Sequence, residues 1–220
     1  MTITLVLMAA LMGAVVWWLF RQSINVQPWI AHSATRDAHE QVLARHPAKT
    51  ALWVFLAVVT SLFALFISAY AIRMHVGDWN PLPKPLLLWW NTLLLAVTSV
   101  AMQWTAVAAR RADAVRVRNG LVAAGALTFA FLAGQLVVWH QLNDAGYFDA
   151  ANPATAFFYL LTAVHGVHVL GGLVAWGRTA SKLARGVDVD HVRLSIELCA
   201  IYWHFLFVVW LVLFALLLAT

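Results

Sequence analysis

The chain of 220 residues is 63% hydrophobic and only 10% charged, with a formal net charge of +5. A soluble domain carries about 25% charged residues, so this chain has too few charges to cover a water-facing surface. Its single cysteine excludes a disulfide framework and any multi-cysteine metal site. The basic residues lie in short loops between apolar runs. Membrane topology explains this placement better than nucleic-acid binding does. The composition therefore predicts a polytopic membrane protein.

Apolar runs of membrane-spanning length recur along the chain. A bilayer core of about 30 Å requires roughly 20 apolar residues in each helical crossing. Six runs satisfy this length: 2–20, 51–72, 86–109, 121–139, 154–176 and 194–218. None alternates apolar and polar residues as the strands of a membrane β-barrel do. The sequence predicts an all-α fold, a polytopic integral membrane helical bundle of six transmembrane helices.

The distribution of basic residues predicts the orientation of these helices. We expect residues 1–20 to be a retained helix rather than a signal peptide, because no basic residue precedes it and Arg21 follows it directly. Twelve of the fourteen Lys and Arg residues follow the first, third and fifth runs, and only Arg73 and Lys84 follow the second and fourth. Basic loops stay in the cytoplasm, so we predict that both termini lie outside.

The predicted helices divide the chain into three parts. These are an N-terminal transmembrane helix at 1–20, a cytoplasmic polar loop at 21–49 and a five-helix bundle at 50–220. The loop contains His32, His39 and His46, whose spacing lacks a compact metal-ligand pattern. We interpret it as solvated, with a short surface helix in part of it.

Four ionisable side chains fall inside predicted spans, where an ionisable group is costly enough to suggest a functional site. They are His165, His168, Glu197 and His204. Three interpretations stay open. The three histidines could bind a metal or haem, Glu197 and the histidines could relay protons, or all four could hydrogen-bond across helices or to a neighbouring subunit.

Small, polar and aromatic residues in the spans predict how the helices pack. Gly166, Gly171 and Gly172 would allow close backbone approach. Neutral polar residues predicted to join helices are Asn91, Thr92, Gln103 and Gln135. Tryptophans predicted to anchor the membrane interface are Trp53, Trp89, Trp90, Trp139 and Trp176. Trp203 and Trp210 are predicted to be packing residues.

Two segments near the C-terminal end carry a specific pattern, FFYLLTAVHGVHVLGGLVAW at 157–176 and ELCAIYWHFLFVVWLVLF at 197–214. This pattern resembles subunit III of the haem-copper terminal oxidases. Residues 52–70, 81–111 and 127–142 are similar to that family's third, fourth and fifth helices, so the resemblance covers the chain from about Lys49 onward.

The resemblance implies a non-catalytic accessory subunit in a bacterial inner membrane. Its partners would be catalytic subunit I and subunit II, which would hold the haem and copper and reduce O2 to water while translocating protons. The chain itself would carry no redox centre and no metal, and would be an enzyme only as part of that complex. It would stabilise the catalytic subunit and bind phospholipid, with no nucleic-acid partner. By that analogy His165, His168, Glu197, Trp203 and His204 would be structural and would face lipid or another subunit.

Three features depart from the family pattern. The usual long form has seven helices, with two before the lipid cleft, whereas one is predicted here. Val59 and Phe207 stand where the family often has carboxylates, which argues against a proton-antenna role. Alternative functions are subunit III of a quinol oxidase, the related accessory protein of nitric oxide reductase, or, from another class, a stand-alone membrane cytochrome or transporter using the histidines.

Overall fold

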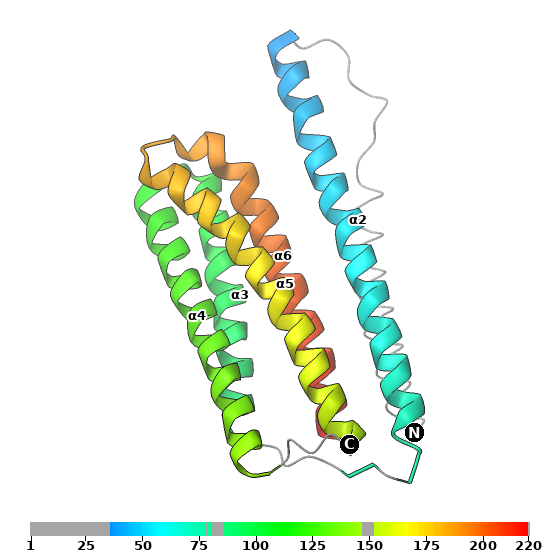
Figure 1. Cartoon of the computed structure of the whole chain (residues 1–220). Helices are drawn as coiled ribbons and strands as arrows, with labels where there is room; N and C mark the ends of the chain where they lie inside the picture. The colour runs from blue at the N-terminus through cyan, green and yellow to red at the C-terminus, as the bar shows by residue number, and fades with distance from the viewer. Residues whose placement is uncertain (1–35, 78, 81–85, 147–151, 220) are drawn as a thin grey trace. The chain divides into compact units, whose positions relative to one another are not determined.

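The computed structural model describes residues 36–77, 79–80, 86–146 and 152–219, with side chains from residue 47 onward. Within these ranges the chain is helical, which confirms the all-α class. The helices are α2 (Arg36–Arg73), α3 (Leu87–Arg110), α4 (Ala114–Asp144), α5 (Pro153–Ala184) and α6 (Val189–Ala219) (Figure 1).

Each of the five helices is long and apolar enough to cross a membrane. They coincide with the last five runs predicted from the sequence, so these five spans are confirmed. The sixth run, 2–20, and the residues before Arg36 lie outside the described residues. The six-helix count and the placement of both termini outside stay predictions.

The helices extend beyond the apolar runs that predicted them. Helix α2 begins at Arg36 and includes Pro47, whereas the sequence predicted a polar loop at 21–49 with only a short surface helix in part of it. This correction has a simple cause, because Arg, Glu, Gln and Lys are good helix formers although they are too polar for lipid. Hydropathy detects only the part of a helix that suits the membrane.

Residues 52–218 form one compact unit. In it α3 and α4 run antiparallel and approach closely, because small residues face one another (Figure 1). A Cβ atom placed on Gly120 would lie 2.1 Å from the hydroxyl oxygen of Thr105. Nearby Ala108 and Ala109 are also buried. Small residues at such contacts replace the hydrophobic effect, which cannot drive helices together in lipid.

Polar side chains cap the first turns of α4 and α5. The Asp113 side chain accepts a hydrogen bond of 3.0 Å from the backbone N–H of Arg116 and so caps α4. Asn152 caps α5 in the same way, through the backbone N–H of Ala154 at 3.1 Å. Such caps satisfy backbone donors that the first turn of a helix leaves free.

Candidate functional site

His204 lies at the middle of α6 and joins that helix to α3. Its Nε2–H donates to the side-chain oxygen of Gln103 at 3.0 Å. Its Nδ1 therefore accepts the hydrogen bond from the Ser99 hydroxyl. Both ring nitrogens are thus occupied by partners from α3, one of which, Gln103, was predicted to join helices.

His165 occupies a different environment on α5. The residue is fully buried, and neither ring nitrogen has a hydrogen-bond partner among the described residues. Aromatic rings surround it, with centroids at 5.2 Å for Trp210, 6.0 Å for Phe131 and 6.5 Å for Phe63. The imidazole therefore packs as an aromatic residue between helices α2, α4 and α6.

His168 lies one turn further along α5 and faces α2 and α6. Its Nδ1–H donates to the carbonyl of Val164 at 2.7 Å, within its own helix. Its ring lies 5.5 Å from that of Phe63, and its backbone carbonyl accepts from the Tyr202 hydroxyl at 2.9 Å. The residue thus contributes to packing through both its ring and its backbone.

These environments bear on the metal and haem interpretation. His165 and His168 both contact Phe63, whereas His204 is bonded to α3. Across the described ranges, no three His, Cys, Asp or Glu side chains gather in an arrangement that could hold a metal ion. The structure therefore brings two of the three predicted histidines to a common neighbour and directs the third elsewhere.

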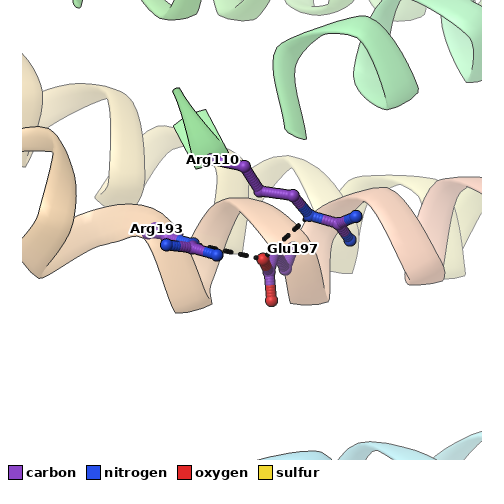
Figure 2. A network of polar contacts seen from close by, with 3 residues as sticks. All are labelled: Arg110, Arg193 and Glu197. Atoms are coloured by element: carbon purple, nitrogen blue, oxygen red, sulfur yellow. Dashed lines mark hydrogen bonds and ion pairs between the residues drawn. The ribbon is translucent and has the colours of Figure 1, made fainter. Parts of the chain in front are cut away.

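Glu197 is paired with two arginines near the start of α6 (Figure 2). Its Oε1 lies 3.2 Å from Nε of Arg110, the last residue of α3, and 3.4 Å from Nε of Arg193, one turn earlier in α6. The Glu197 side chain is 16% exposed, less than either arginine. The pair with Arg110 joins α6 to the end of α3. From the sequence alone, both arginines were expected only in basic loops.

Trp203 and Trp210 are buried and hydrogen-bonded across helices. The indole N–H of Trp203 donates to the Thr128 hydroxyl of α4 at 3.1 Å, and that of Trp210 donates to the Thr92 hydroxyl of α3 at 3.0 Å. Each hydroxyl in turn donates to a carbonyl one turn earlier in its own helix. Every polar hydrogen in these contacts is therefore satisfied, as lipid surroundings require.

Two predicted interface anchors also take part in helix packing. The indole N–H of Trp139 donates to the Thr162 hydroxyl of α5 at 3.1 Å. That of Trp176 donates to the Leu121 carbonyl of α4 at 3.0 Å, beside Gly125. These hydrogen bonds could not be predicted from the sequence, because the position of a tryptophan near a run end does not reveal which way it faces.

The glycines predicted to allow close approach differ from one another. Gly172 contacts Tyr202 closely, since an added Cβ would lie 2.8 Å from its ring. Among the described residues, Gly166 and Gly171 have nothing within 4 Å of that position, so neither allows a close approach between described helices. The close contacts are instead made by Gly120, Gly125 and Gly134 of α4, which hydropathy alone did not distinguish.

The pair Asn91 and Gln135 fulfils the prediction that polar residues join α3 and α4. Their side chains are buried and share a hydrogen bond of 3.4 Å. Gly134 makes room for this pair, because a Cβ there would lie 2.1 Å from the Asn91 side-chain oxygen.

A cavity of about 450 Å³ lies between α2, α5 and α6. Apolar side chains including Leu52, Phe55 and Leu198 line it, with Arg178 and Lys182 from the last turns of α5. The chain's single cysteine, Cys199, also lines it. A cavity with an apolar wall and cationic groups toward one end suits an amphipathic molecule with an anionic head.

Comparison with known sequences gives a consistent family. Residues 53–219 match the sequence profile of the family described as cytochrome c oxidase subunit III. A probable cytochrome c oxidase subunit 3 of Mycobacterium bovis is 30% identical over 170 residues, covering 75% of this chain and 83% of the relative. The cytochrome c oxidase subunit 3 of Synechocystis is 31% identical over 172 residues, covering 74% and 71%. That of Thermostichus vulcanus is 29% identical over 171 residues, covering 76% and 84%.

Proposed function

We propose that this chain, which belongs to the cytochrome c oxidase subunit III family, stabilises the catalytic subunit of a terminal oxidase and holds phospholipid beside it. Membership of this family makes it a multi-pass bacterial membrane protein and a subunit of a terminal oxidase. The haem and copper that reduce O2 would lie in subunits I and II. The electron donor would be cytochrome c, in keeping with the names of the relatives.

The observation that carries this proposal is that two ionisable residues in the spans, His204 and Glu197, have polar partners on a neighbouring helix. His204 is bonded to Ser99 and Gln103, and Glu197 is bonded to Arg110 and Arg193. Polar groups that satisfy one another between helices stabilise a membrane bundle. A transporter would instead direct such groups toward a water-filled path. This arrangement supports a scaffold, and it favours packing over a proton relay.

The cavity supports the lipid-binding part of the proposal. Its wall near Phe55, Gly172 and Tyr202 suits an acyl chain, and Arg178 and Lys182 suit an anionic phosphate. Each basic residue near a membrane surface contributes about 1 kcal/mol to the attraction of anionic lipid. The positive-inside orientation would place these two residues at the cytoplasmic leaflet, where anionic lipids are abundant.

The lipid site can be tested with charge-neutralising variants of the purified complex. We expect Arg178→Gln combined with Lys182→Gln to lower retained anionic phospholipid roughly tenfold or more, measured by mass spectrometry of extracted lipid. Arg185→Gln is the matched control, because Arg185 caps the same helix but does not line the cavity. Equal lipid retention in the double variant and the control would contradict the proposed site.

In the proposed topology both termini lie outside and the three basic segments lie in the cytoplasm. The basic residues that end α3 and α5 support it, since Arg110 and Lys182 lie in the last turns of these helices. A reporter fused to the C-terminus that is active only outside the cytoplasm is expected to be active. An active cytoplasmic reporter at that position would contradict this orientation.

The subunit assignment can be tested by purification in gentle detergent through a tag on this chain. We expect haem to accompany the chain together with a catalytic subunit identified by mass spectrometry. The haem absorption spectrum should disappear when that partner is stripped away. Haem that stays on the isolated chain would contradict the proposal and would make His165, His168 and His204 candidate ligands.

A further inference from the structure

A polar side chain lies exposed on the apolar α3–α6 face at membrane depth. Gln103 is exposed about one turn from the middle of α3, and its neighbour His204 is half-buried at the middle of α6. Exposed apolar residues next to Gln103 on α3 include Val100 and Trp104. An exposed amide is expensive in lipid, because the hydrocarbon offers it no hydrogen-bond partner.

The hydrogen bonds of this pair do not involve the Gln103 amide nitrogen. The Gln103 oxygen accepts from His204, and His204 accepts from Ser99. Across the described ranges, the Gln103 amide nitrogen has no acceptor. Ser61 of α2 shows the contrast, because its exposed hydroxyl donates to the Ala57 carbonyl of its own helix at 3.0 Å. A hydroxyl can be satisfied locally in this way, and the Gln103 amide is not.

The apolar run at 2–20 has no acceptor side chain in its middle. Between Thr4 and Trp17 it contains only apolar residues, none of whose side chains carries an oxygen or nitrogen atom. A surface that satisfies the Gln103 amide therefore needs a polar side chain at this depth.

We propose that the α3–α6 face around Gln103 is where a transmembrane helix of a partner oxidase subunit docks, with a polar side chain that accepts from the Gln103 amide. This inference rests on the proposed function, since it assumes that the chain resides in an oxidase complex. The hydrogen bond fixes the register of the partner helix, and the apolar residues beside it provide the packing area.

Photocrosslinking in the intact complex tests the proposed face. A photoreactive amino acid replaces Val100, which is 68% exposed one turn from Gln103, or Val122 of α4, which is 63% exposed. Val122 lies at a similar depth, because the neighbouring contact of Gly120 with Thr105 sets the register of α4 on α3. We expect position 100 to crosslink to a partner oxidase subunit at least several-fold more than position 122.

Two other crosslinking results would overturn the inference. One is crosslinking at position 100 to lipid alone, and the other is crosslinking to a second copy of this chain. Either result, in a preparation that retains the haem-bearing subunit, overturns the docking face and leaves the proposed function intact. A preparation without any haem-bearing subunit overturns the proposed function and, with it, this inference.

A substitution tests the role of the amide itself. We expect Gln103→Leu to reduce the fraction of the chain that remains with the complex in detergent by about threefold, the factor that one interhelical hydrogen bond is worth. Ser61→Ala is the control and should leave this fraction unchanged, because the Ser61 hydroxyl bonds its own helix. Equal retention of the two variants would overturn the proposed hydrogen bond.

Discussion

The two sides of the compact unit at residues 52–218 are built differently. Helices α3 and α6 each bury 44% of their most apolar stretch, whereas α2 buries 22%. Tryptophan–threonine hydrogen bonds and close glycine contacts join α6 and α3 to α4. Aromatic rings join α2 to α5 and α6, as in the contact of Phe63 with His168 at 5.5 Å. The lesson is that small and hydrogen-bonded residues close an interface in a membrane bundle, whereas bulky rings leave room for a cavity.

The largest expected effect comes from removing a tryptophan from the close-packed side. Trp203→Ala deletes a fully buried side chain and its bond to Thr128, so we expect a loss of about 3 kcal/mol in the free energy of unfolding. The effect is measured by unfolding the purified complex with denaturant and monitoring the release of this chain. Trp90→Ala is the control, because Trp90 is 58% exposed and should cost only about 0.5 kcal/mol.

Adding a single methyl group should destabilise the protein at the tight interface but not at the open surface. In Gly120→Ala the new Cβ meets the hydroxyl, Cβ and Cα atoms of Thr105, so we expect a destabilisation of about 1–3 kcal/mol. In Gly166→Ala the new Cβ meets no described residue within 4 Å, so this variant should be neutral or stabilising, because alanine is the better helix former. Thermal denaturation of both variants measures the difference. Equal loss in the two would show that α3 and α4 are not in close contact at Gly120.

The ion pairs offer a smaller test of the same close-packed side. Glu197→Gln removes the charge that faces Arg110 and Arg193, and we expect it to cost about 1 kcal/mol because Glu197 is mostly buried. Asp113→Asn should cost less, since its pair with Arg116 is more exposed and asparagine still caps a helix. The same unfolding measurement applies, and a larger loss for Asp113→Asn would contradict the role given to Glu197.

The membrane spans were predictable from the sequence because they depend on composition over many residues. The five described helices fall on the predicted runs, and the family resemblance was readable from the residues around His165 and Trp203. The helix ends were less predictable, since polar helix formers carried α2 back to Arg36. Composition thus locates a span well and its ends poorly.

The individual contacts were harder to predict because they depend on which way each helix faces. Asn91 and Gln135 were correctly expected to join helices, but their mutual partnership requires the register of α3 against α4. The partners of Glu197 and the cavity lined by Arg178 required three-dimensional placement for the same reason. Gly166 was expected to allow close helix approach, but no described residue approaches it. The sequence around a helical glycine does not show whether another helix faces it.

The reactivity of Cys199 tests most directly the claim that the open side holds phospholipid. Cys199 is the chain's only cysteine and lines the cavity, so the extent of its modification by a membrane-permeant alkylating reagent can be followed by peptide mass spectrometry. In the purified complex we expect added anionic phospholipid to slow this labelling several-fold. The protection should be largely lost in the combined Arg178→Gln and Lys182→Gln variant. An equal labelling rate with and without phospholipid in the unmodified chain would contradict the account.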